Sequence, residues 1–235
     1  MKTEEQTNLK ATLIDLVLVL VTLFTLKHLL LQLPEFWTFA GPISLLASLG
    51  VATWRLKKNN ESWKSIGFIQ DQTKIKLALW TVVALVTTIL LGNIAAQLVT
   101  PLFASNPATN EISQVMAGRF ANLPGNLTVY LYWLIVAWII GGFTEELLFR
   151  GFLINRIEKL FYRVPFAIGI AVLFQALIFG QQHFYYQGLV GFVSTGVIGL
   201  ASGLIYVYCK RRLWPLILSH GLANTLGMTI LFFNG

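Results

Sequence analysis

Long apolar stretches recur along the whole chain, and each has about the length that a helix needs to cross a membrane. They cover residues 11–33, 36–54, 75–99, 127–153, 165–183, 189–208 and 214–233. About 20 consecutive apolar residues are enough for a transmembrane helix. The stretches are continuous rather than alternating, which argues against a membrane β-barrel. The pattern therefore predicts an all-α fold, a polytopic transmembrane helical bundle with about seven spans.

The composition agrees with a membrane protein. Of the 235 residues, 56% are hydrophobic and only 11% are charged, against about 25% charged residues in a soluble domain. We expect a single membrane domain over residues 1–235. The first ten residues carry acidic side chains, and no small-residue cleavage site follows the first apolar stretch. We therefore expect this stretch to be a retained helix rather than a signal peptide.

Basic residues are concentrated in alternate connections between the predicted spans. Seven spans put the following on one side of the membrane: Lys2, Lys10, Arg55, Lys57, Lys58, Lys64, Lys74, Lys76, Arg156, Lys159, Arg163, Lys210, Arg211 and Arg212. The other side receives Arg119 and Lys27. Loops rich in Lys and Arg stay in the cytoplasm. This predicts a multi-pass protein of the cell inner (plasma) membrane with a cytoplasmic amino terminus. The net charge of +7 is then a topology signal, and we expect the lipid bilayer, not nucleic acid, as a partner.

The connection over residues 101–126 is the longest on the outer side. Within it, Ile112, Val115, Met116 and Phe120 recur at nearly helical spacing. A short helix on the membrane surface and an ordinary loop fit this pattern equally well.

Three charged residues stand together in the apolar stretch 127–153. A charge at the centre of a membrane helix costs about 2.5–3.5 kcal/mol on insertion scales. Glu146 and Arg150 are four residues apart, with the acid first, which favours an ion pair on one helix face. Glu145 has no such partner in its own helix, so it is a functional candidate. In an alternative interpretation, Gly141-Gly142 breaks the helix and Thr144 caps a new one.

Two further pairs of residues lie on later spans. His183 follows Phe179 by four residues, and Asn224 follows His220 by four, so each pair shares a helix face. If the spans that hold Glu145 and His183 form an antiparallel hairpin, the midpoint is residue 164. The turn signal Arg163-Val164-Pro165 lies there, which predicts that Glu145 and His183 are level across the hairpin. A Glu, two His and an Asn fit hydrolysis by an activated water.

These motifs resemble a known family of membrane proteins. Glu-Glu-x-x-x-Arg at 145–150, Phe-x-x-x-His at 179–183 and His-x-x-x-Asn at 220–224 resemble the CPBP (Abi) family. That family contains the type II CAAX prenyl endopeptidases and bacteriocin-processing or immunity proteins. The resemblance implies an intramembrane endopeptidase whose core is residues 127–233, with 1–126 as accessory spans and outer loop.

The resemblance also implies roles for single residues. Glu145 is the base that activates water, and His183 helps to hold that water. His220 and Asn224 form the oxyanion site. Glu146, Arg150 and Phe179 support the site. We expect a water-filled cavity that opens to the cytoplasm and gives access to Glu145.

Cofactor and substrate stay open at this point. Glu145, His183 and His220 could form a His₂Glu zinc site, but the HExxH motif is absent, and we favour no metal. Cys209 is the single cysteine, which excludes an intrachain disulfide and a thiolate cluster.

The substrate is a CAAX-type prenylated protein or a bacteriocin-like or membrane peptide. A non-catalytic immunity or binding protein is the main alternative. A proton-coupled transporter is less favoured because no repeated halves occur. The sequence does not define the oligomeric state.

Overall fold

The computed structural model describes residues 2–103 and 118–234, and every regular element within these ranges is helical. The predicted all-α class is therefore confirmed. The elements in chain order are α1 (Lys2–Leu31), η1 (Pro34–Phe39), α2 (Ala40–Lys58), η2 (Trp63–Ile66), α3 (Lys74–Phe103), α5 (Leu127–Val136), η3 (Ala137–Leu153), α6 (Ile154–Leu160), α7 (Ala167–Tyr208) and α8 (Trp214–Phe233).

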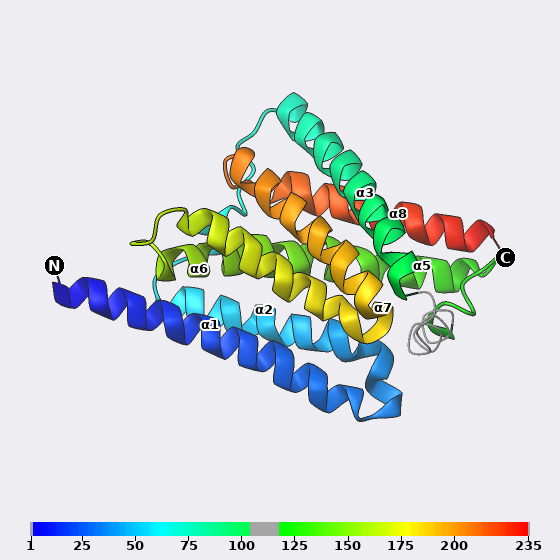
Figure 1. The fold of residues 1–235 in the computed structure, drawn as a ribbon, viewed down its shortest axis with the longest axis horizontal. Helices are drawn as coiled ribbons and strands as arrows, with labels where there is room; N and C mark the ends of the chain where they lie inside the picture. The colour runs from blue at the N-terminus through cyan, green and yellow to red at the C-terminus, as the bar shows by residue number, and fades with distance from the viewer. Residues whose placement is uncertain (1, 104–117, 235) are drawn as a thin grey trace.

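Among the described residues, six helices are long and apolar enough to cross a membrane, and they hold the seven predicted spans. α5, η3 and α6 follow one another without a break and form one span. α7 has 42 residues and consists of two helices that meet at a kink, where Gly188 has a non-helical backbone. In Figure 1 its yellow first part and orange second part form a V that closes at this kink. The two parts are the fifth and sixth predicted spans.

Small residues bring the two parts of α7 close together. A Cβ on Gly180 would lie 3.2 Å from the Cα of Gly196, and one on Gly199 would lie 3.2 Å from the Cα of Ala176. Gln175 donates a hydrogen bond of 2.7 Å from Nε2 to the carbonyl oxygen of Gly199. Close backbone approach through small residues is typical of helix packing in membranes. The two parts therefore run antiparallel from the kink.

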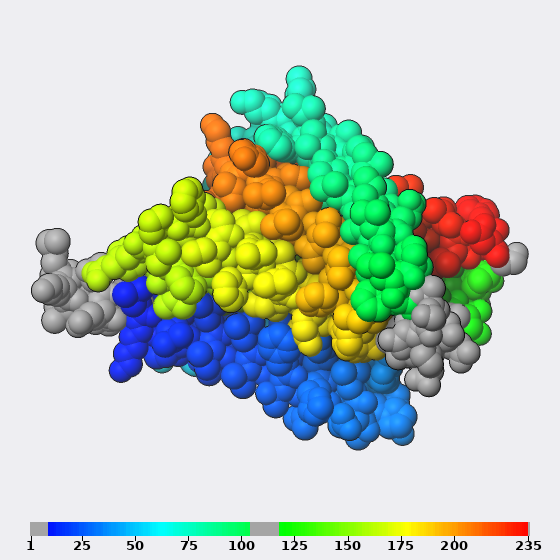
Figure 2. All heavy atoms as spheres, viewed as in Figure 1, coloured from blue at the N-terminus to red at the C-terminus, as the bar shows by residue number. Residues whose placement is uncertain are grey.

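Large apolar side chains cover the outside of the bundle. On α3, Ile75 is 81% exposed, Leu98 69% and Leu102 73%, so exposed apolar residues extend from one end of the helix to the other. On the face in Figure 2, α1, α7 and α3 lie one above another across the molecule. An apolar surface of this extent is expected where the protein contacts lipid rather than water.

The hairpin predicted around residue 164 is confirmed. α6 ends at Leu160, α7 begins at Ala167, and the two helices pack against each other. The predicted second span, residues 36–54, lies within the candidate membrane span Pro34–Lys58, which consists of η1 and α2. Of the candidate surface helix, Ile112, Val115 and Met116 lie outside the described residues, whereas Phe120 packs its ring 4.9 Å from that of Trp133.

Candidate active site

Glu145 and Glu146 lie in η3, which is a π-helix. In a π-helix the backbone hydrogen bonds span five residues, and such segments are rare and frequent at functional sites. The hydroxyl of Thr144 donates to the carbonyl oxygen of Ile139, five residues earlier, at 2.8 Å. The helix runs through Gly141-Gly142 without a break. The alternative with Thr144 as the cap of a new helix is therefore wrong, because the widened helix keeps its backbone hydrogen bonds through the glycines.

Gly141 and Gly142 allow α8 to approach η3. A Cβ on Gly141 would lie 2.4 Å from Nδ2 of Asn224 and 3.3 Å from Nε2 of His220. A Cβ on Gly142 would lie 3.3 Å from the Cα of Gly221 in α8. Because neither glycine has a side chain, His220 and Asn224 reach the helix that carries Glu145.

Glu146 joins two basic groups. Its carboxylate lies 3.2 Å from Nη1 of Arg150, which confirms the ion pair expected from the spacing. The same Oε1 lies 2.8 Å from Nδ1 of His220. The Glu146 side chain is 2% exposed and that of Arg150 is 0% exposed. A carboxylate at one ring nitrogen fixes the orientation of an imidazole. The contact between Glu146 and His220 joins two helices, and no spacing within one helix could predict it.

Phe179 is the centre of the packing beneath the site. Its ring lies 4.4 Å from the guanidinium carbon of Arg150, within the range of a cation–π interaction. It also packs on the rings of Phe149 at 5.1 Å and His183 at 4.8 Å. Phe179 is 2% exposed. It therefore supports both the guanidinium and the imidazole.

Glu145 and His183 line the same cavity, one from each helix of the hairpin. Phe149 and Phe179 lie four residues nearer the turn on each helix and are in ring contact, so the predicted register is confirmed. Nδ1 of His183 lies 2.9 Å from the carbonyl oxygen of Phe179. A carbonyl accepts hydrogen bonds only, so Nδ1 carries the proton and Nε2 of a neutral His183 is an acceptor.

Glu145 faces His220 across a short gap. Oε2 of Glu145 lies 3.9 Å from Nε2 of His220, and the Glu145 side chain is 12% exposed. This distance is longer than a hydrogen bond. Nδ2 of Asn224 lies beside these groups and 3.4 Å from the carbonyl oxygen of Ala137. Glu145, His183, His220 and Asn224 therefore converge on one space.

That space is a cavity of about 380 Å³, within the usual range for ligand pockets. Its walls also include Gly41 of α2, Trp133 of α5 and Met228 of α8. These residues lie toward the end of the bundle that holds η1, the α7 kink and the last turn of α8. The walls therefore lie toward the end opposite the basic loops, whereas the opening of the cavity to the cytoplasm stays a prediction.

Several cavity residues were not predicted from the sequence. Tyr186 stacks 5.6 Å from the ring of His183, and the guanidinium carbon of Arg119 lies 5.1 Å from the Tyr186 ring and 5.2 Å from that of Trp133. Tyr186 could have been found, because it lies in the helical turn that follows His183. The predicted span ends at residue 183, just before this turn. Arg119 precedes a span and carries no motif.

A site without a metal ion stays a prediction from the sequence. Within the described residues, no three His, Cys, Asp or Glu side chains are arranged to hold a metal ion. Nδ1 of His183 and Nδ1 of His220 already have hydrogen-bond partners. The mechanism proposed for this site uses only the side chains of the protein and a water molecule.

Comparison with known proteins concerns the second half of the chain. Neither the curated proteins nor the solved structures include a match to this chain. Residues 127–226 match the family model for type II CAAX prenyl endopeptidase Rce1-like proteins. The matched segment contains all three motifs and runs from the start of α5 into α8. This carboxy-terminal part of the chain is therefore similar to the type II CAAX prenyl endopeptidases.

Proposed function

We propose that the chain is an intramembrane endopeptidase in which Glu145 activates the water that attacks the peptide carbonyl. The observation that carries this proposal is the convergence of Glu145, His183, His220 and Asn224 on one cavity. Glu146 is held by Arg150 and His220, whereas Glu145 has no partner within hydrogen-bond distance in its own helix or in α8. Of the two carboxylates, Glu145 is therefore the one free to accept a proton.

The hydrogen-bond roles around the cavity suit a bound water. Nε2 of neutral His183 is an acceptor, because its Nδ1 donates to Phe179. A water that donates one hydrogen to Glu145 and the other to His183 keeps an oxygen lone pair for attack. Glu145 takes the proton as the bond from water oxygen to carbonyl carbon forms. It then returns this proton to the leaving amine nitrogen as the carbon–nitrogen bond breaks.

Asn224 and His220 can stabilise the oxyanion in different ways. The amide of Asn224 has a second N–H besides the one directed at Ala137. The carboxylate of Glu146 accepts from Nδ1 of His220, so Nε2 donates toward the cavity only when His220 is protonated. The pair of donors supports an oxyanion site.

The substrate in this proposal is a peptide or a segment of a membrane protein. The match to the type II CAAX prenyl endopeptidase model supports a CAAX-type endopeptidase, and a prenylated protein or a bacteriocin-like peptide is the narrower candidate. The helical bundle carries the site inside the membrane, with the amino terminus in the cytoplasm.

The test uses the purified full chain and a pool of fluorescence-quenched apolar peptides, with a farnesylated set beside it. Glu145→Gln should lower kcat by about 10²–10⁴-fold, the usual contribution of a general base, with an unchanged melting temperature. The matched control is Glu35→Gln, since Glu35 is an exposed acid in η1. Chelator should leave the wild-type rate unchanged. Equal cleavage by Glu145→Gln and wild type would contradict the proposal, and loss of activity in chelator that zinc restores would contradict the metal-free mechanism.

A further inference from the structure

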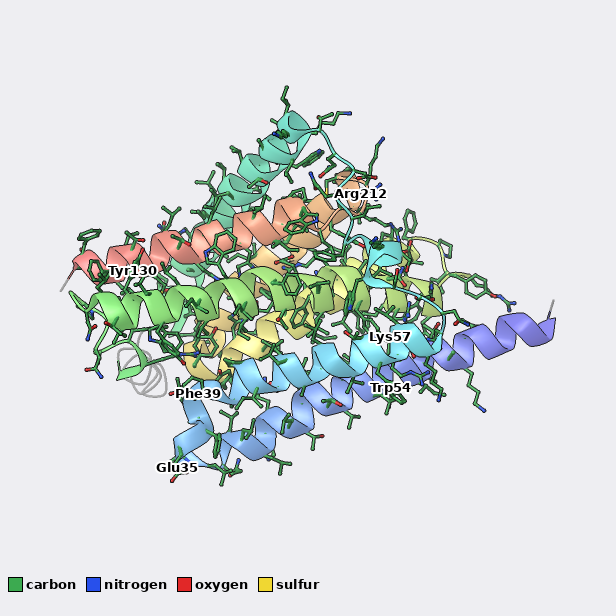
Figure 3. All side chains as sticks on the ribbon, turned by 180° about the vertical axis from the view of Figure 1, so that it is seen from behind. Glu35, Phe39, Trp54, Lys57, Tyr130 and Arg212 are labelled. Carbon is green, nitrogen blue, oxygen red and sulfur yellow. The ribbon has the colours of Figure 1, made fainter. Side chains whose placement is uncertain are left out.

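Lys27 is a basic residue buried in a membrane-spanning helix. It lies near the end of α1 that leads into η1, where Glu35 and Phe39 are labelled in Figure 3. Lys27 is 5% exposed, and none of the ion pairs between described residues includes it. A charged side chain within a membrane helix is costly and is usually tied to function. The contacts that Lys27 makes instead must offset this cost.

Lys27 reaches from α1 to the part of α7 that carries His183. Its Nζ donates a hydrogen bond of 3.3 Å to Oε1 of Gln181. The same oxygen accepts a hydrogen bond of 3.0 Å from Nε2 of Gln182. Gln182 is 6% exposed and lines the cavity together with Glu145. The ammonium group of Lys27 thus holds the amide oxygen to which a wall residue of the cavity is hydrogen-bonded.

A second set of contacts leads from Lys27 to His183 through aromatic rings. Nζ of Lys27 lies 5.5 Å from the centre of the Tyr185 ring, within the range of a cation–π interaction. The Tyr185 ring lies 4.7 Å from that of Tyr186, which lies 5.6 Å from the ring of His183. Both tyrosines line the cavity. Residues 181–186 are therefore held to α1 on both sides of His183.

We propose that Lys27 is a positioning residue for His183. Lys27 does not line the cavity, so it acts on the reaction through residues 181–186. By holding this segment to α1, it keeps Nε2 of His183 at the place where His183 binds the attacking water. This proposal rests on the proposed function. It gives α1, which lies outside the matched residues 127–226, a part in the reaction.

Lys27→Met separates positioning from simple stabilisation. Methionine is about as long as lysine but has no hydrogen-bond donor, and the change removes a charge that is costly in a membrane helix. The melting temperature should therefore not fall. The kcat for quenched peptides should fall about tenfold or more, because a displacement of about 1 Å can cost about 10²-fold in rate. KM should change little, because Lys27 does not line the cavity.

Two further variants make this comparison specific. Lys27→Arg keeps a cation with hydrogen-bond donors and should recover most of the rate. Lys10→Met is the matched control, because Lys10 is an exposed lysine of the same helix, and it should retain the wild-type kcat. Equal kcat values for Lys27→Met and wild type would overturn the proposal.

Gln181→Met tests the route from Lys27 without a change of charge. Gln181 is exposed, so this variant decides the question even if Lys27→Met does not fold. Gln181→Met alone should lower kcat. The double variant should be as slow as Lys27→Met alone, because residues in one hydrogen-bond network are not additive. A wild-type kcat for Gln181→Met, or rate losses that multiply in the double variant, would overturn the proposal.

A measurement that needs no activity separates this proposal from the proposed function. The chain has three histidines, so nitrogen NMR of histidine-labelled protein gives few signals, and His183→Gln identifies the signal of His183. That signal should move in Lys27→Met and stay in place in Lys10→Met. If the wild type cleaves no peptide but the signal moves in this way, the proposed function fails and the positioning by Lys27 stands. An unmoved His183 signal in Lys27→Met would overturn the proposal whatever the rates.

Discussion

Glu146 is the residue on which two different interactions of the site depend. It neutralises the buried guanidinium of Arg150 and orients the imidazole of His220. Its neighbour Glu145 does neither, although the two are adjacent in the sequence. The two carboxylates should therefore respond differently to the same substitution.

Glu146→Gln should lower both stability and activity. The change leaves Arg150 buried without a negative partner, and breaking a buried pair costs about 3–5 kcal/mol. It also removes the charge that holds the ring of His220. Thermal unfolding in detergent and kcat measure the two effects, with Glu145→Gln as the matched neighbour that loses activity alone. A melting temperature for Glu146→Gln equal to that of wild type would show that the ion pair between Glu146 and Arg150 does not contribute to folding stability.

Gly141 is a residue at which one methyl group should impair the site. A Cβ there would lie 2.4 Å from Nδ2 of Asn224, so Gly141→Ala must push this amide away from its position beside His220. A displacement of about 1 Å in a catalytic group can cost about 10²-fold in rate. The control is Gly227→Ala in the same α8 helix as Asn224, where a Cβ meets nothing within 4 Å.

The measurement is kcat for both alanine variants, together with their melting temperatures. Gly227→Ala should match wild type or gain slightly in stability, because alanine favours a helix over glycine. Equal rates for the two variants would mean that the position of Asn224 does not matter for turnover.

At the level of elements, a buried ionic network joins α1 to α2 and α6. Asp15 of α1 is 0% exposed and lies 2.6 Å from Nε of Arg55 and 2.8 Å from Nε of Arg156. Glu61 extends the network, since it pairs with Arg156 at 2.8 Å and with Lys159 at 2.8 Å. α6 continues directly from η3, so this network fixes α1 and α2 against the helix that carries Glu145.

Asp15→Asn should destabilise the protein strongly. The change removes the negative charge of Asp15 from the buried guanidinium groups of Arg55 and Arg156. Breaking a buried ion pair costs about 3–5 kcal/mol of folding stability. Asp71→Asn is the control, because Asp71 pairs with Arg212 on the surface, where ion pairs contribute little. Thermal unfolding of the two variants in the same detergent measures the difference. A fall in melting temperature as large for Asp71→Asn as for Asp15→Asn would contradict a special contribution of the buried network.

The sequence predicts elements better than it predicts contacts between them. Apolar length defines the spans, and the proline turn at 163–165 correctly puts Glu145 and His183 on the same level. The ion pair between Glu146 and Arg150 follows from spacing within one helix. The contact of Glu146 with His220 depends instead on the packing of α8 against η3, which two glycines permit. The π-helix likewise depends on hydrogen bonds that no periodicity of apolar residues reveals.

At the scale of the whole molecule, the walls of the cavity come from helices that the sequence does not bring together. Gly41 of α2, Trp133 of α5 and Met228 of α8 line it together with Glu145. No spacing within one helix predicts such a set, because the packing between helices decides which side chains share a cavity. The direction in which the cavity opens stays a prediction.

The first three spans carry no motif, yet they form part of the site. Gly41, Pro42 and Leu45 of α2 line the cavity, and α3 packs against both α7 and α8. The division into a core at 127–233 and accessory spans at 1–126 stays a prediction. It has a testable consequence, because a fragment that begins at residue 118 contains every motif but lacks the α2 wall and the Asp15 partner of Arg156.

We expect the fragment 118–235 to be inactive when expressed alone. Without Asp15, Arg156 loses the carboxylate that lies 2.8 Å from its Nε, and without α3 the apolar contact faces of α7 and α8 lose their cover. Co-expression of residues 1–117 as a separate chain should restore cleavage, because helices in a membrane can associate after separate insertion. The comparison measures peptide cleavage in membranes that contain the fragment, the two chains together, or the full chain. Full activity of the fragment alone would establish that the amino-terminal spans are accessory, whereas inactivity that co-expression reverses would make them part of the catalytic unit.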